Sequence, residues 1–229
     1  VAHLDFSALS IYLATAAGLF FVLLVAQGGS SRAAVLALSG IFSNTATIGI
    51  PLIGLAYGKE ALVVLFTLIS MHSLVLLTMT TVVLELCSAR EQAHAGHTRS
   101  GHLRTIGLAV RNAIFHPVPM PIIAGLLFAQ TGWVLPEVVD RPLQLLANAF
   151  SPVALVLMGV TLAKTSIGQH LRAALVISSI KNLLHPLLMT LLGYAAGLRG
   201  ITLTVLVMTA ALPIGANVSR RNNDTVPEL

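Results

Sequence analysis

The chain has 229 residues, of which 56% are apolar and only 9% carry a formal charge. A soluble globular domain carries about 25% charged residues, so this composition excludes a soluble module and predicts an integral membrane protein. The net charge of +5 does not indicate a nucleic-acid partner, because the thirteen Lys and Arg residues lie mostly in short gaps between apolar blocks. The single cysteine, Cys87, excludes an intrachain disulfide.

Seven apolar blocks follow one another, and each is long enough to cross about 30 Å of hydrocarbon as a helix. We predict helices rather than strands, because no ten-residue alternation of apolar and polar residues occurs. The predicted fold is a single all-α polytopic membrane domain over residues 1–229. Its spans are predicted at about 8–26, 33–57, 61–86, 117–133, 142–163, 173–198 and 201–218.

The polar stretch 87–104 is the longest gap between blocks, and we predict that it is a cytoplasmic loop. In that orientation the inside segments hold nine Lys and Arg residues and the outside segments hold three, which is a clear positive-inside bias. The visible N-terminus is then outside. Because the chain starts at Val1 without a basic leader region, we expect a segment of a longer protein. The tail 219–229 changes character abruptly, and we interpret it as a truncated or shifted reading frame rather than a stop-transfer flank.

Two of the spans carry similar interruptions. Around Pro51 and around Pro213 the sequence has Thr-Ala, then an aliphatic residue before the proline, then a glycine shortly after. Proline removes a helical hydrogen bond, and a nearby glycine lets the backbone leave the helix. In lipid such a break is tolerated only where the freed groups face protein, water or a ligand. A matched pair of breaks favours a transporter's central site over two simple kinks.

Each predicted break creates a half-helix N-terminus within the membrane, where free N–H groups and a partial positive charge attract a carboxylate. Asn44 lies about two turns before Pro51, and Asn217 about one turn after Pro213. Their amides can donate to a carboxylate without burying a charge. The predicted substrate-binding residues are Asn44, Gly49, Pro51, Pro213, Gly215 and Asn217.

Lys181 is the one cation well inside a predicted span, and His185 lies one turn later on the same face. Two interpretations remain open for this pair. Either it attracts substrate or couples a proton, or Lys181 reaches toward the interface beside a structural histidine. For His72, in the middle of the third span, we favour a neutral imidazole bonded to a neighbouring helix. The histidines of the 87–104 stretch lack the spacing of a metal site, so we predict neither metal nor cofactor.

The two interrupted motifs, from Phe42 to Pro51 and from Ala211 to Asn217, resemble those of the auxin efflux carrier family. Supporting likenesses are Ser151-Pro152 with Gly159, and the spacing of Lys181, His185 and Pro186. The likeness extends from the first span to Val218. Bacterial members of that family are carriers for malonate or malate.

The resemblance implies ten helices in two inverted five-helix repeats, of which the seven spans here would be the third to the ninth. It implies that helices four and nine cross at Pro51 and Pro213, with Asn44 and Asn217 beside the substrate carboxylate. It further implies an elevator movement, with spans 117–133 and 142–163 in a scaffold through which a homodimer could form. The chain lacks the end helices of both repeats, so we expect only the complete protein to transport.

We therefore predict a secondary carrier in the bacterial inner membrane for a small organic anion, a carboxylate or a dicarboxylate such as malonate, with coupling to H⁺ or Na⁺ left open. A sodium-coupled symporter of similar fold is the first alternative, although no acidic residue lies deep in a span. A non-functional truncated carrier is the second. An intramembrane enzyme using His72 or His185 is disfavoured, because neither has an acidic partner at mid-membrane depth. No nucleotide-binding loop is present, which argues against an ATP-driven pump.

Overall fold

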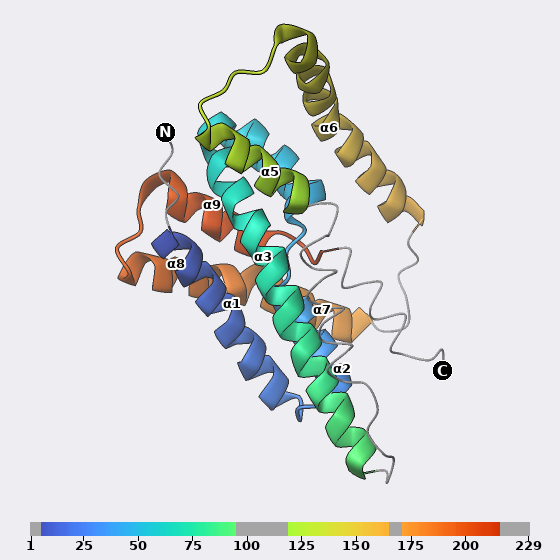
Figure 1. The fold of residues 1–229 in the computed structure, drawn as a ribbon. Coiled ribbons are helices and arrows are strands. Elements are labelled where there is room, and N and C mark those ends of the chain that lie inside the picture. Colours follow the sequence, from blue (N-terminus) through green and yellow to red (C-terminus); the bar gives the residue numbers. More distant parts are fainter. Residues whose placement is uncertain (1–5, 95–118, 165–170, 216–229) are drawn as a thin grey trace.

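The structure is a computed structural model, and it describes residues 6–94, 119–164 and 171–215. Over these residues the chain is helical, which confirms the predicted all-α class (Figure 1). The helices are α1 (Phe6–Ala26), α2 (Ser31–Ile41), α3 (Ile50–His94), α5 (Pro119–Gln130), α6 (Glu137–Lys164), α7 (Leu171–Ser179), α8 (His185–Ala195) and α9 (Gly200–Ala211). Two five-residue π-helical turns, η1 (Thr45–Gly49) and η2 (Ile180–Leu184), lie directly before α3 and α8.

Among the described residues, four helical stretches are long and apolar enough to cross a membrane, namely Phe6–Ala26, Thr45–Ser88, Glu137–Ala163 and Ala174–Ala195. The helices α2 and α9 are also apolar, but they have only 11 and 12 residues. At 1.5 Å per residue each is about 17 Å long, or roughly half the thickness of the hydrocarbon. The chain is therefore a multi-pass membrane protein in which two of the helices are half-length.

The longest helix, α3, is a hairpin of two arms. Gly58 has a left-handed φ of 72° within it, so the helix is interrupted and the chain turns back at this residue. Gly54 on the first arm lies directly against Leu62 on the second. Ile53 and Ala61, one from each arm, are fully buried in a cluster that also contains Val205 of α9. Residues 50–57 and 61–86 of α3 thus belong to two different predicted spans, 33–57 and 61–86.

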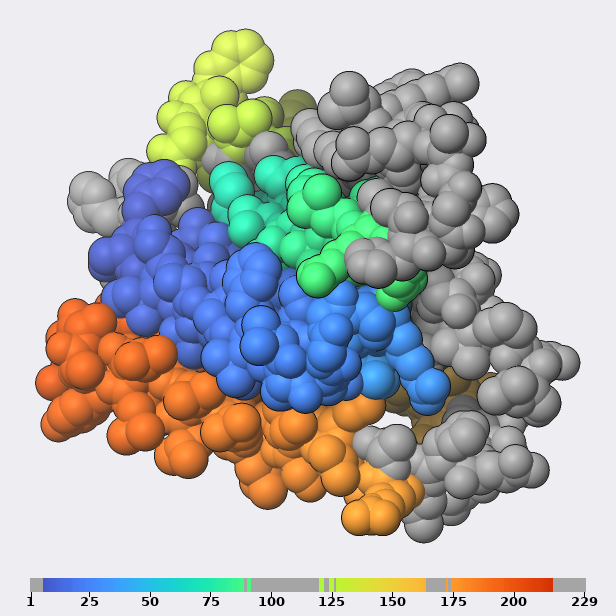
Figure 2. Space-filling view, turned by 90° about the horizontal axis from the view of Figure 1, so that it is seen from below, coloured from blue at the N-terminus to red at the C-terminus, as the bar shows by residue number. Residues whose placement is uncertain are grey.

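The main core lies between α1, α2, α3, α8 and α9. In α1 the buried side chains recur at helical spacing, as at Leu9, Tyr12, Ala16 and Leu19. Gly40 lets α2 approach α1 closely, because a Cβ atom there would lie only 2.6 Å from a Leu23 methyl carbon. Seen from below, α1 and α2 are covered on one side by the orange C-terminal helices and on the other by the green end of α3 (Figure 2).

The C-terminal end of α3 lies beyond the predicted boundary between the third span and the loop. The polar stretch predicted as a loop from residue 87 is helical through His94. Glu91 explains this extension, because its carboxylate accepts hydrogen bonds from the N–H and the hydroxyl of Ser31, both at 2.8 Å. A carboxylate is favourable at this position, the positive N-terminus of α2. Residues 95–104 of the predicted loop and the tail 219–229 lie outside the described residues.

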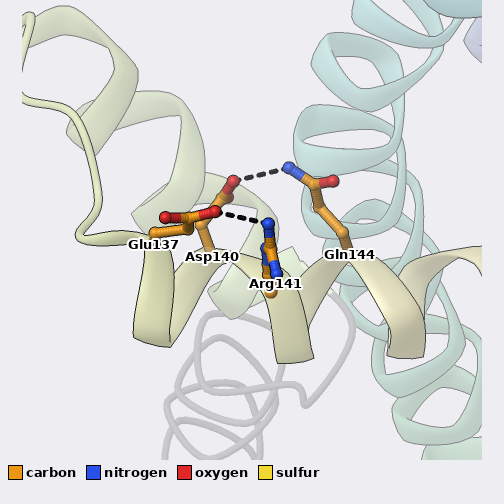
Figure 3. Close-up of polar contacts among 4 residues, drawn as sticks. All are labelled: Glu137, Asp140, Arg141 and Gln144. Atoms are coloured by element: carbon orange, nitrogen blue, oxygen red, sulfur yellow. Dashed lines mark hydrogen bonds and ion pairs between the residues drawn. The ribbon is translucent and has the colours of Figure 1, made fainter.

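Helix α6 starts with a polar turn and then exposes most of its side chains. Arg141 forms an ion pair with Glu137 at 2.7 Å, and Gln144 donates to Asp140 (Figure 3). The two acidic side chains lie where the helix dipole favours negative charge. The helix therefore begins at Glu137, ahead of the predicted start at 142, and it contacts α3 and η1.

Candidate substrate site at the helix crossing

Two non-helical segments meet in the interior of the molecule. The helix α2 ends at Ile41 and α9 ends at Ala211, and the residues after each are extended. The Asn44 N–H donates to the Pro213 carbonyl at 2.9 Å, and the Gly215 N–H donates to the Phe42 carbonyl at 3.1 Å. These bonds form an antiparallel bridge between Ser43 and Ile214. The two interrupted helices are therefore joined by backbone hydrogen bonds.

The geometry of the bridge indicates how deep in the membrane the crossing lies. Because the two segments are antiparallel, α2 and α9 approach it from opposite directions. Each helix is long enough to cover about half of the hydrocarbon, so their ends meet near the middle of the membrane. Backbone groups freed from a helix at that depth must find partners within the protein, and the two bridge bonds supply them for Phe42, Asn44, Pro213 and Gly215.

The position of the first interruption differs from the prediction. The sequence placed it at Gly49 and Pro51, whereas the helix is broken at residues 42–44 and Pro51 is the second residue of α3. The π-helical turn η1 gives the reason. In it the Ile50 N–H bonds to the Thr45 carbonyl, five residues back, and this widened turn accommodates a residue that lacks an N–H. Pro51 therefore continues a helix, and Asn44 is the residue that pairs with Pro213.

Asn44 begins the half-helix on the first side of the crossing. Its side-chain oxygen accepts from the Thr47 N–H at 3.2 Å, which is a helix N-cap. In the part of the chain that the structure describes, its amide NH₂ group has no partner. The Ala46 N–H, in the same first turn, likewise has none among the described residues. The N-terminus of η1 thus presents two hydrogen-bond donors and the positive end of a helix dipole.

Gly49 and Gly215 allow the two segments to approach closely. The sequence predicted that these glycines let the backbone leave the helix, but neither has a left-handed φ. A Cβ atom on Gly215 would lie 2.6 Å from the Phe42 ring, and one on Gly49 would lie 2.8 Å from a Leu212 methyl carbon. Real Cβ atoms do not make such contacts, so the absent side chains are what permits the crossing.

The remaining predicted site residues lie as follows. Pro213 is in the second extended segment and is exposed, and its carbonyl accepts the bridge bond from Asn44. Asn217 lies outside the described residues, as does the half-helix that was predicted to follow Pro213. The structure therefore describes one donor-bearing helix end at the crossing, on the Asn44 side.

Lys181 and His185 lie beside the crossing, and both are fully buried. The Nζ group of Lys181 donates to the carbonyl of Ala210, in the last turn of α9. Of the two interpretations left open, the one in which Lys181 reaches toward the interface is wrong, because its side chain has no exposed surface. A cation in this place is favourable to the negative C-terminus of α9.

His72 and Tyr12 complete the surroundings. The prediction that His72 bonds to a neighbouring helix is wrong, since neither ring nitrogen has a partner among the described residues. Instead the imidazole stacks on Phe42 with ring centroids 4.8 Å apart. Tyr12, which sequence reasoning missed, lies with its hydroxyl 3.4 Å from the Ser43 hydroxyl. The available indication was a tyrosine within an apolar block, because a buried tyrosine hydroxyl usually has a hydrogen-bond partner.

Comparison with known proteins identifies the family to which the chain belongs. The chain is 25% identical over 228 residues to auxin efflux carrier component 8 of Arabidopsis thaliana. That alignment covers 82% of this chain, and the chain spans 62% of the length of the plant protein. The family described as membrane transport protein, a family of transporters and not of enzymes, matches residues 2–219. Since this match covers nearly the whole of the described helical domain, the chain belongs to the membrane transport protein family of the auxin efflux carriers.

Proposed function

We propose that this protein is a secondary carrier for a small organic anion, a carboxylate or a dicarboxylate such as malonate, and that the anion binds at the helix crossing. One observation carries the proposal. In the part of the chain that the structure describes, the half-helix that starts at Asn44 carries two donors without a partner, the Ala46 N–H and the Asn44 amide NH₂. Donors of this kind at a helix N-terminus suit a carboxylate.

The chemistry of such a site fits a carrier better than an enzyme. Neutral donors and a helix dipole bind an anion without a permanent countercharge at the point of contact. We propose that Asn217 supplies a second amide from the other side of the crossing. An elevator movement, the ten-helix inverted repeat and the location in a bacterial inner membrane belong to the same proposal, and they rest on the resemblance of the two interrupted motifs.

The test is uptake of radiolabelled malonate into proteoliposomes that contain the full-length protein, with malate and auxin as further probes. Auxin is included because the plant relative is named for it. The decisive variant is Asn44→Asp. Aspartate caps a helix as well as asparagine does, so folding is preserved. It removes the NH₂ donor and places a negative charge against the substrate.

We expect Asn44→Asp to reduce malonate uptake at least tenfold, because a hydrogen bond to a charged group contributes about 1.5–3 kcal/mol. Asn217→Ala should reduce it to a similar extent. Asn148→Ala, on the exposed surface of α6, is the matched control and should transport like the wild type. Unchanged uptake by the Asn44 and Asn217 variants would show that the anion binds elsewhere. Failure of the wild-type protein to move any of the three probes would overturn the proposed substrate class.

A further inference from the structure

A second group of polar side chains lies buried beside the crossing. Tyr12, His72, Lys181 and His185 come from α1, α3, η2 and α8, and none has exposed surface. The Tyr12 ring lies 5.7 Å from the ring of His72 and 5.8 Å from that of His185, measured between centroids. Lys181 lies four residues before His185, in the π-helical turn that leads into α8. Three parts of the chain that are distant in sequence, α1, α3 and the consecutive elements η2 and α8, therefore bring three bases and a tyrosine together.

This cluster contains bases without an acid. Among the described residues Lys181 has no carboxylate partner, and all four imidazole nitrogens of His72 and His185 lack a hydrogen bond. The neighbouring helix α9 carries no titratable side chain, while α2 and α7 carry Arg32 and Arg172 in their first turns, where both are exposed. A charge within the cluster is thus uncompensated, and in a membrane interior that is costly.

The cluster touches the first segment of the crossing and the last turn of α9, which leads into the second segment. Lys181 donates to the Ala210 carbonyl, three residues before Pro213 in the second segment. On the first segment, the Tyr12 hydroxyl contacts Ser43 and the His72 ring stacks on Phe42. An anion that binds at the crossing would therefore act on Lys181 at short range. It would supply the negative charge that the cluster lacks.

We propose that Lys181 is a proton-binding site coupled to anion binding at the crossing. When the crossing is empty, Lys181 is a neutral amine that still donates to Ala210. When a carboxylate binds, the Nζ lone pair takes up one proton from water, and the resulting ammonium offsets the new negative charge. No other bond is made or broken. Only one proton enters, because two charges within the same buried cluster repel each other. Buried lysines change protonation readily, which suits Lys181 to this role.

This inference rests on the proposed function, and it predicts a specific pH dependence. Between the protonation midpoints of the empty and the anion-bound states, binding is accompanied by proton uptake. Affinity in that interval is proportional to proton concentration, so the Kd rises about tenfold for each unit of pH increase. Below the interval Lys181 is charged in both states, and above it Lys181 is neutral in both, so the dependence disappears on either side.

The experiment measures malonate binding to the purified full-length protein across the pH range in which malonate is fully ionised. A pH indicator in weak buffer reports the protons taken up. For the wild type we expect about one proton per malonate and the tenfold dependence just described. Lys181→Arg retains a donor to Ala210 and a permanent charge, since arginine stays protonated. It should bind malonate with no proton uptake and no pH dependence. Lys59→Arg, at an exposed position of α3, should match the wild type.

Lys181→Met, which removes the titrating group and leaves an apolar side chain, serves as the second variant if the arginine does not fit. It should bind malonate weakly and independently of pH. Malonate binding without proton uptake by the wild type would overturn this inference alone, as would an unchanged pH dependence in both Lys181 variants. Absence of malonate binding by the wild type at every pH would overturn the proposed function, and this inference with it.

Discussion

The two sides of the crossing interrupt their helices by different chemistry. On the first side, residues 42–44 contain no proline, and the new helix starts because the Asn44 side chain caps it. On the second side, Pro213 cannot donate to the α9 carbonyl one turn back, so that helix ends in the turn before it. One break is therefore made by a polar cap and the other by a missing donor. Both leave an extended segment, and the two segments pair.

Prolines elsewhere in the molecule support this distinction. Pro51 and Pro186 each occupy the second residue of a helix that follows a five-residue π-helical turn. In both cases the N–H of the preceding residue bonds five residues back, Ile50 to Thr45 and His185 to Ile180. The helix continues past both prolines. A proline within a membrane span can thus indicate a local widening of the helix as well as a break.

The largest expected effect comes from filling the space between the two segments. In Gly215→Ala the new Cβ atom would lie 2.6 Å from the Phe42 ring and 3.2 Å from the Ser43 carbonyl oxygen. The ring cannot move freely, because it is stacked on His72 and only 4% exposed. We expect a loss of about 1–3 kcal/mol in the free energy of unfolding. In a chain of this size the Tm should fall by about 2–4 °C per kcal/mol, as measured by thermal unfolding in detergent.

A matched glycine provides the control for that substitution. Gly159 lies within the C-terminal part of α6, and no atom lies within 4 Å of the position a Cβ would take. Gly159→Ala should leave the Tm unchanged or raise it slightly, because alanine is favoured over glycine in a helix. An equal fall in Tm for both variants would contradict the close approach at Gly215.

We expect the second-largest effect on stability from the helix N-cap that Asn44 forms on the first side of the crossing. Asn44→Ala removes the acceptor for the Thr47 N–H, and loss of an N-cap costs about 0.5–2 kcal/mol. Asn44→Asp retains that acceptor and should unfold at the wild-type temperature. The pair of variants separates the structural role of Asn44 from its role toward the anion. If Asn44→Ala proved as stable as Asn44→Asp, the side chain would not be what starts the half-helix.

The helical class and the presence of interruptions could be predicted from the sequence, but the contacts between neighbouring helices could not. Apolar length indicated a polytopic helical protein, and the polar residues around Asn44 indicated an interruption. The exact break was mistaken because proline was the stronger local feature, whereas the cap and the π-helical turn depend on backbone bonds that leave no sequence pattern. Hydropathy predicts the depth of a residue and not its neighbours. The position of Lys181 within a span was therefore foreseeable, but its complete burial and its acceptor, the Ala210 backbone carbonyl, were not.

The smallest effects on stability, and the sharpest comparison, come from replacing the two motif prolines. Pro51→Ala and Pro213→Ala should each lower the free energy of unfolding by only about 0.4–1 kcal/mol, through the greater freedom of the unfolded chain. They should differ at the crossing. Alanine at 213 gains an N–H that can extend α9 and compete with the bridge, whereas alanine at 51 only adds a bond within α3. Hydrogen exchange of the Asn44 amide reports the bridge directly, because this N–H donates to the residue 213 carbonyl. We expect faster exchange in Pro213→Ala and wild-type exchange in Pro51→Ala. The reverse result would place the crossing at Pro51 after all.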